Sequence, residues 1–174
     1  MKNIILIGFM GAGKTTVGQE LSQLTGLALI NLDDEIIKKI KMPIHQFFKE
    51  YGEEAFRVIE EELLEKFSHQ PIILATGGGV VVRLNNRMIL QKGQTVLLDA
   101  SIKTLIQRIR EDKTTIRPLA VNSSDEEITQ LFETRKMFYQ QSARLIVKTD
   151  DKNAQEVASE IIKNLKDNFE NLPQ

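Results

Sequence analysis

The chain of 174 residues is 41% hydrophobic and 27% charged, a composition typical of a single soluble globular domain that covers residues 1–174. Its net charge of −1 gives no overall attraction to nucleic acid, so an anionic ligand has to be held by a local cluster. The absence of cysteine excludes disulfides and thiol chemistry and is consistent with a cytoplasmic location.

Short apolar runs predict strands, and amphipathic patterns between them predict helices. Strands are expected at 3–7, 27–30, 72–75, 95–98 and 145–147. Helices are expected at 15–24, 34–41, 44–51, 52–67, 84–91, 101–110, 125–143 and 153–168, with a frayed tail at 169–174. Continuous apolar strands that alternate with helices indicate an α/β fold, a five-stranded parallel sheet with helices on both faces.

The ends and the surface of the chain add three expectations. The N-terminus leads directly into the first strand, so no signal peptide is expected. No apolar run approaches the roughly 18–20 residues that a membrane helix needs, so we expect no membrane partner. No exposed apolar stripe argues for an obligate dimer, and the chain is expected to be a monomer.

Residues 8–15, GFMGAGKT, fit the phosphate-binding pattern G-x-x-x-x-G-K-[ST] between a strand and a helix. Glycines let the backbone come close to an anion, and the first N–H groups of the next helix favour phosphate. Lys14 adds a mobile charge for the β- and γ-phosphates, and the Thr15 hydroxyl can ligate Mg²⁺. The residues expected to bind ATP in this segment are Gly11, Ala12, Gly13, Lys14, Thr15 and Thr16.

Two further turns follow predicted strands, one at Asn31 and Asp33 and one at Gly77–Gly79. Ligands of parallel sheets bind beyond the carboxyl ends of the strands, so these turns and the phosphate loop should converge. Asp33 could accept a hydrogen bond and a proton from a substrate hydroxyl, or it could cap a helix. The three glycines indicate either close approach of a ligand or a tight strand-to-helix turn.

Four arginines are candidates for anion binding. Arg57, with Glu60 three residues later, could grip a substrate carboxylate or form a solvated surface pair. Arg135 allows the same two interpretations. Arg117 lies in a polar segment and could bring a cation to a transferring phosphoryl group, or it could be an exposed loop residue. Arg110, at the base of that segment, could stack on a nucleotide base.

Taken together, these motifs resemble the shikimate kinase family over nearly the whole chain. The motifs that carry the resemblance are the phosphate loop Gly8–Thr15, the Asn31-Leu32-Asp33 turn, Phe56-Arg57-x-x-Glu60, Gly77-Gly78-Gly79, Arg117-Pro118-Leu119 and Arg135-x-x-x-Tyr139. The resemblance implies the three-layer P-loop fold of nucleoside-monophosphate-kinase-like proteins, with a mobile lid at about 111–124. It also implies transfer of the γ-phosphoryl group of ATP to the 3-hydroxyl of shikimate with Mg²⁺, a step in aromatic amino acid biosynthesis.

The resemblance assigns a role to each candidate. Asp33 would hold the ring hydroxyls of shikimate. Lys14 and Arg117 would neutralise the transferring phosphoryl group, and Thr15 would ligate Mg²⁺. The residues that would bind the shikimate carboxylate or line its pocket are Arg57, Arg135, Gly77, Gly78 and Gly79. Arg110 would lie over adenine, and Lys152 falls near the adenine loop.

Asn31 departs from the family pattern, which usually has D-x-D at the end of the second strand. An amide oxygen can accept a hydrogen bond from a metal-bound water, but it brings no charge and cannot act as a base. We therefore expect weaker metal binding and Asp33 as the only base candidate at this turn. Two alternatives remain at this point, another small-acid or polyol kinase such as a gluconate-type kinase, and a non-enzymatic nucleotide switch.

Overall fold

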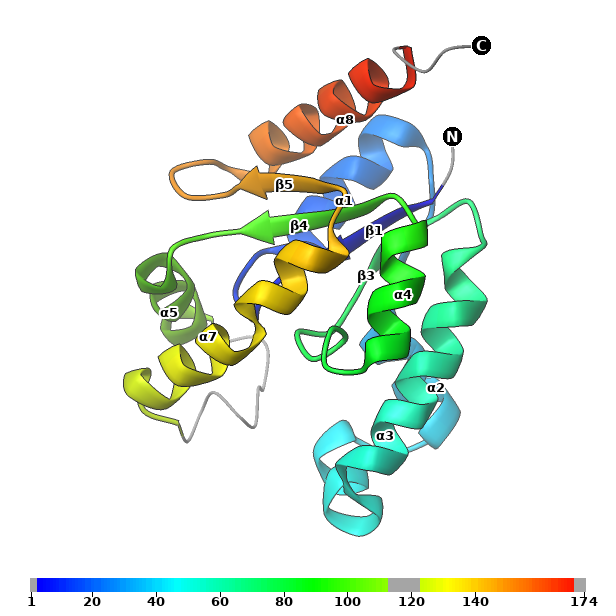
Figure 1. Ribbon diagram of the computed structural model, residues 1–174, viewed down its shortest axis with the longest axis vertical. Coiled ribbons are helices and arrows are strands. Elements are labelled where there is room, and N and C mark those ends of the chain that lie inside the picture. The colour runs from blue at the N-terminus through cyan, green and yellow to red at the C-terminus, as the bar shows by residue number, and fades with distance from the viewer. Residues whose placement is uncertain (1–2, 113–122, 171–174) are drawn as a thin grey trace.

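The computed structural model describes residues 3–112 and 123–170, the latter without the side chains of 167–170. Its strands are β1 (Ile4–Ile7), β2 (Leu29–Asn31), β3 (Ile73–Ala75), β4 (Thr95–Asp99) and β5 (Leu145–Lys148). Its helices are α1 (Lys14–Thr25), α2 (Leu32–Ile40), α3 (Ile44–Ser68), α4 (Leu84–Lys92), α5 (Ile102–Glu111), α7 (Asp125–Ser142) and α8 (Ala154–Glu170) (Figure 1).

The five strands form one parallel sheet in the order β2-β3-β1-β4-β5, which confirms the predicted fold class. The central strand β1 is completely buried, because its four apolar residues meet helices on both faces of the sheet. The second strand begins two residues later than predicted, since its pairing with β3 starts at Leu29 opposite Ile73. All strands run in the same direction, so their carboxyl ends meet at one edge.

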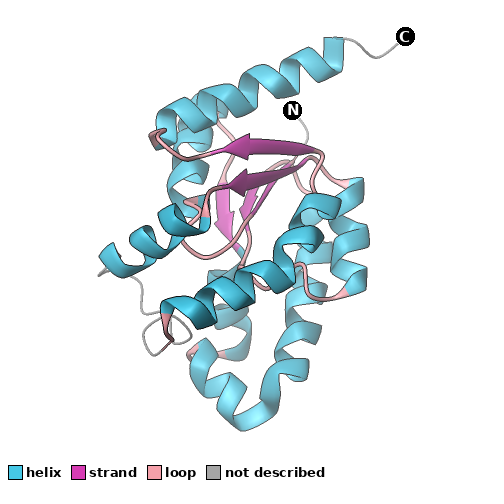
Figure 2. Cartoon of the chain, turned by 60° about the vertical axis from the view of Figure 1, so that its left-hand side comes forward, coloured by secondary structure: helices cyan, strands magenta, loops and turns pink. Residues whose placement is uncertain are grey.

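Helices cover both faces of the sheet. Helices α1 and α8 pack together on one face, and α4 and α7 pack together on the other. Helices α2 and α3 pack against each other and project beyond the sheet (Figure 1), and α2 also contacts β2. Figure 2 shows the strands in the interior with the helices around them. No helix within the described ranges is long and apolar enough to cross a membrane.

Several helix ends refine the predictions. Helix α2 starts at Leu32 with Asn31 at its N-cap, so Asp33 lies in the first turn and is not the cap. Gly52, with φ 80°, interrupts α3 where two separate helices were predicted. Ser124 caps α7 through a capping box with Glu127. Helix α8 continues to Glu170, so residues 169 and 170 are helical and not part of a frayed tail.

The predicted lid at 111–124 lies largely outside the described residues. Helix α5 ends at Glu111, and α7 begins at Asp125. Arg117 also lies outside the described residues, and its role stays a prediction.

Candidate active site

The phosphate loop joins β1 to α1 at the centre of the sheet. Gly13, at the N-cap of α1, has φ 89°, a left-handed conformation that a residue with a Cβ rarely adopts. The Lys14 ammonium group curls back over the loop and donates hydrogen bonds to the carbonyl oxygens of Gly8 (2.7 Å) and Phe9 (3.0 Å). The first N–H groups of α1 and the Lys14 charge together give this loop the properties of an anion site.

Thr15 and Asn31 carry neutral side-chain oxygens beside this loop. The Thr15 hydroxyl donates to Asn31 Oδ1 at 3.1 Å, so the two predicted metal-site residues are in contact. The described residues hold no group of three or more histidine, cysteine, aspartate or glutamate side chains that could bind a metal. Such a donor set fits a Mg²⁺ ion that takes most of its negative oxygens from nucleotide phosphates.

Asp33 faces solvent from the first turn of α2, yet protein atoms crowd its carboxyl group. A Cβ on Gly77 would stand 2.8 Å from Asp33 Oδ1, so the glycine loop leaves no room for a side chain there. This partial desolvation raises the pKa of Asp33 above its usual range, although the nearby charges of Lys14 and Arg57 lower it. Asp33 therefore lies within electrostatic range of both Lys14 and Arg57, and its carboxyl group is more basic than usual.

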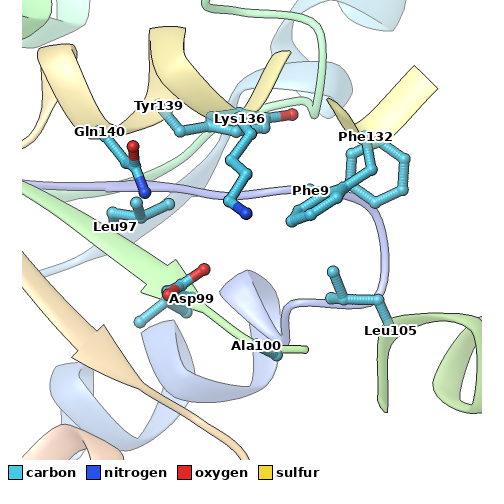
Figure 3. Close-up of a pocket in the computed structure, with 10 residues that line it drawn as sticks. Phe9, Leu97, Asp99, Ala100, Leu105, Phe132, Lys136, Tyr139 and Gln140 are labelled. Atoms are coloured by element: carbon cyan, nitrogen blue, oxygen red, sulfur yellow. The ribbon is translucent and has the colours of Figure 1, made fainter. Parts of the chain in front are cut away.

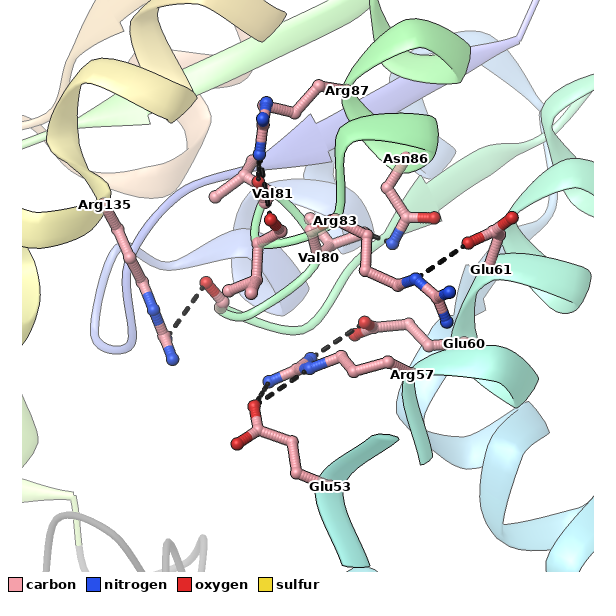
Figure 4. A network of polar contacts seen from close by, with 12 residues as sticks. Glu53, Arg57, Glu60, Glu61, Val80, Val81, Arg83, Asn86, Arg87 and Arg135 are labelled. Atoms are coloured by element: carbon pink, nitrogen blue, oxygen red, sulfur yellow. Dashed lines mark hydrogen bonds and ion pairs between the residues drawn. The ribbon is translucent and has the colours of Figure 1, made fainter. Parts of the chain in front are cut away.

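Arg57 is a buried residue, not the surface arginine of the alternative interpretation. It is 7% exposed, and its Nη1 donates to Oε2 of Glu60, which is 1% exposed, at 2.8 Å (Figure 4). Its Nε and Nη2 both donate to Oε1 of Glu53, at 3.2 and 3.0 Å. Burial lowers the pKa of Arg57, but Glu60 and Glu53 outweigh this effect and raise it. The Arg57 guanidinium group therefore stays charged although it is buried, which is rare for a charged side chain in a folded protein.

The glycine loop after β3 lies directly against this guanidinium group. A Cβ on Gly79 would stand 2.5 Å from Arg57 Nη1 and 2.8 Å from Cζ, so a side chain at position 79 would force the guanidinium group to move. On the other side of the loop, the Gly78 carbonyl oxygen accepts hydrogen bonds from the Tyr139 hydroxyl and from Arg135 Nη1 at 3.4 Å. The glycines therefore let the loop pack closely against Arg57, with Arg135 at the same loop, and close approach of a ligand stays a prediction.

Residues that sequence reasoning did not select hold the rest of the loop. Asn86 is fully buried and donates to the Val80 carbonyl oxygen at 2.9 Å. Arg87 Nη1 donates to the carbonyl oxygens of Val81 (2.8 Å) and Val82 (2.9 Å), and its guanidinium group lies over the Phe138 ring (Figure 4). Their only sequence signal is their place in the helix that follows the glycines. These bonds fix the path of the backbone that faces Arg57.

A cavity of about 310 Å³ lies behind the phosphate loop, and it is large enough for part of a nucleotide. Residues of the phosphate loop and α1, including Thr16, line one side, and Lys152 lines the other. The arginine in its wall is Arg108, which donates to Thr149 Oγ1 (3.0 Å) and to the Thr149 carbonyl oxygen (2.8 Å). Lys152 Nζ also pairs with Glu160 at 2.6 Å.

Arg110, the arginine predicted to lie over adenine, is not among the residues that line this cavity. Its guanidinium group contacts Asp125 Oδ1 at 2.8 Å and the Ser123 carbonyl oxygen at 2.7 Å. The helical period explains the difference. Arg108 follows the buried Leu105 by three residues and shares its side of α5, whereas Arg110 projects toward the start of α7.

Two other hollows contain none of the predicted site residues. A cavity of about 10 Å³, room for one water, lies where α7 packs on the phosphate loop through an edge-to-face contact of Phe9 and Phe132 at 5.4 Å (Figure 3). An open groove of about 620 Å³ runs along the outer side of α3 and α4. We therefore assign the site to the phosphate loop and its neighbours, not to these hollows.

Comparison with known proteins agrees with this geometry. A model of the shikimate kinase family matches residues 10–166. The chain is 44% identical to the shikimate kinase of Enterococcus faecalis over 168 residues, which cover 96% of this chain and 100% of that protein. The structure of shikimate kinase from Acinetobacter baumannii in complex with shikimate matches with a TM-score of 0.88 at 33% identity, covering 97% of this chain and 94% of that chain.

A gluconokinase from Sinorhizobium meliloti also shares the fold. Its TM-score is 0.62 at 16% identity, with 98% of this chain and 94% of that chain covered. At that level of identity the likeness concerns the fold alone.

Proposed function

The chain belongs to the shikimate kinase family, and on that premise we propose that it transfers the γ-phosphoryl group of ATP to the 3-hydroxyl of shikimate. The products are shikimate 3-phosphate and ADP, and the reaction is a step of aromatic amino acid biosynthesis. ATP would occupy the phosphate loop and the cavity beside Arg108, and shikimate would lie against Asp33, Arg57 and the glycine loop.

One observation carries the choice of acceptor. Arg57 is a buried cation at the same glycine loop as Arg135 and within electrostatic range of Asp33. A buried, oriented guanidinium group suits a planar carboxylate, which it can bind through two parallel hydrogen bonds. A hydroxyl acceptor for Asp33 and a carboxylate for the arginines describe a small hydroxylated acid, and shikimate is such an acid.

The phosphoryl step requires charge and position more than covalent chemistry. The substrate oxygen attacks the γ-phosphorus, and the bond from that phosphorus to the bridging oxygen of ADP breaks. Lys14 would hold the β- and γ-phosphates, and Arg117 would add a second cation. A Mg²⁺ ion bound with ATP, with Thr15 as ligand and Asn31 next to it, would neutralise phosphate charge.

Asp33 would orient the attacking hydroxyl and take up its proton. Its raised pKa makes the carboxylate a better proton acceptor than an ordinary aspartate. Asn31, as an amide, cannot take this role.

We also propose that the protein is a monomer and that it is located in the cytoplasm. The absence of cysteine is in keeping with that location.

The experiment that tests this function measures ADP release from purified protein with Mg²⁺-ATP, with and without shikimate, beside gluconate as a control. We expect strong stimulation by shikimate and none by gluconate. Stimulation by gluconate alone would overturn the acceptor while retaining a kinase. Stimulation by neither, with ATP still bound, would favour a nucleotide switch.

A further inference from the structure

Glu53 occupies the edge of Arg57 that a substrate carboxylate needs. Arg57 Nε and Nη2 form the side edge of the guanidinium group, and both donate to the same Glu53 oxygen, at 3.2 and 3.0 Å (Figure 4). A carboxylate that binds arginine side-on uses these two N–H groups. Glu53 thus makes, from within the protein, the contact that the proposed function assigns to shikimate.

The other edges of Arg57 are not open to such a contact. The terminal edge, between Nη1 and Nη2, faces Gly79 so closely that even a Cβ would stand 2.8 Å from Cζ. The remaining side, at Nη1, is taken by Glu60 at 2.8 Å. Because Glu60 is 1% exposed, its carboxylate cannot leave Arg57 and be solvated by water instead. A second carboxylate can therefore reach the guanidinium group side-on only where Glu53 now lies.

Glu53, by contrast, can release Arg57 and turn toward solvent. Its side chain is 59% exposed, so its carboxylate can exchange Arg57 for water at little cost. It also follows Gly52 directly, the residue with φ 80° at which α3 is interrupted, so it begins the second helical segment of α3. The side chain is thus held by Arg57 alone among the ion pairs of the described residues.

We propose that Glu53 is an internal competitor for Arg57, which shikimate displaces when its carboxylate binds side-on to Nε and Nη2. This inference rests on the proposed function. In the absence of the acid, Glu53 pairs with the buried Arg57 and holds its Nε and Nη2 donors in a fixed orientation. When the acid binds, its pair with Arg57 replaces the pair of Glu53 with Arg57. The affinity for shikimate is therefore lower than it would be if Nε and Nη2 of Arg57 had no partner in the free protein.

The test is calorimetric titration of shikimate into wild type and Glu53→Gln, since the chain has no tryptophan to report binding. Loss of a partly exposed pair should lower the Kd for shikimate by about two- to fivefold, with the KM for ATP unchanged. Glu54→Gln is the matched control, because Glu54 is the next residue, is 81% exposed and pairs with Arg83. It should bind shikimate as wild type does.

Titration of the methyl ester of shikimate distinguishes competition from a general structural effect. The ester has no carboxylate, so Glu53→Gln should give it no gain in affinity. An unchanged or higher Kd for shikimate in Glu53→Gln, or an equal gain with the ester, would overturn the proposal. Absence of shikimate binding by wild type would overturn the proposed function as well. Failure of the Glu53 proposal alone is therefore distinguishable, because wild type would then still bind shikimate.

A structure of the wild-type protein with shikimate decides the question even if Glu53→Gln does not fold. We expect the substrate carboxylate at Nε and Nη2 and the Glu53 carboxylate turned into solvent. Retention of both Glu53 bonds in that complex would contradict the proposal.

Discussion

Arg57 and Glu60 form an ion pair of 2.8 Å, one turn apart on α3, in which both side chains are shut off from solvent. Burial outweighs the attraction of Arg57 and raises the pKa of Glu60. A pair of this kind costs desolvation energy on both sides, so its presence indicates that the guanidinium group is needed where it lies.

Glu60→Ala should destabilise the fold because it removes the fully buried partner of Arg57. We expect the free energy of unfolding to fall by about 3 kcal/mol, measured by urea denaturation. Glu62→Ala is the control, since Glu62 forms an exposed pair with Lys39, and its loss should cost less than about 1 kcal/mol. Equal effects of the two variants would argue against a structural role of the buried pair.

Arg57→Ala should weaken the binding of the acid substrate. Loss of a charge-assisted contact of about 1.5–3 kcal/mol corresponds to a rise of roughly 10- to 150-fold in the KM for shikimate. Arg57→Lys keeps the charge but lacks the paired N–H donors of the guanidinium group, so it should restore only part of the lost shikimate binding. Steady-state kinetics at saturating ATP measure both, and an unchanged KM would return Arg57 to a purely structural role.

Asp33→Asn should reduce kcat by roughly 100-fold or more, as loss of a general base does, while the fold becomes more stable at pH 7. The sign follows from the raised pKa of Asp33. The folded protein holds the proton more tightly than the unfolded chain, so wild type loses stability as pH rises through the folded pKa.

The asparagine variant lacks that loss, so its advantage in urea denaturation should shrink as pH falls from 7 toward the model-compound value of 3.8. The same shift places the acid limb of the wild-type kcat/KM profile, which reports groups of the free enzyme, above 3.8. Near-normal turnover in the variant would remove Asp33 from the reaction.

Gly79→Ala should impair acid binding more than Gly78→Ala. A Cβ at Gly79 meets Arg57 Cζ at 2.8 Å, whereas one at Gly78 meets its nearest atom, Met10 N, at 3.4 Å. We expect a larger rise in the KM for shikimate at position 79, with the KM for ATP retained. The reverse order would mean that Arg57 does not set the shape of this loop.

Arg108→Ala should raise the KM for ATP more than Arg110→Ala does. Arg108 lines the cavity in which we propose that ATP binds and donates to the Thr149 carbonyl oxygen at 2.8 Å, while Arg110 contacts Asp125 outside the cavity wall. Initial rates at saturating shikimate compare the two. A larger effect at Arg110 would support the assignment made from the sequence.

Much of the arrangement was accessible from sequence because it depends on local patterns. The phosphate loop needs glycines between a strand and a helix, and parallel strands bring their carboxyl ends to one edge. Asp33 and Gly77–Gly79 could therefore be placed beside Lys14 from their position after strands alone.

What sequence reasoning could not settle depends on contacts between distant elements. An arginine and a glutamate three residues apart on a helix usually form a surface pair, but Arg57 and Glu60 are buried, and the glycine loop packs against the Arg57 side chain. The bonds of Asn86 and Arg87 to the loop carbonyls depend on the start of α4 in the same way. The period of α5 from the buried Leu105 also indicates that Arg108, three residues later, lies on the inner side of that helix.

Helix α7 joins the two ends of the site. Its first residue, Asp125, contacts Arg110 of α5, and Arg135 and Tyr139 on the same helix hold the Gly78 carbonyl oxygen. From Asp125 to Tyr139 the helix rises by about 21 Å. One helix therefore contacts both the glycine loop that faces Arg57 and α5, the helix that carries Arg108 on the wall of the cavity beside the phosphate loop.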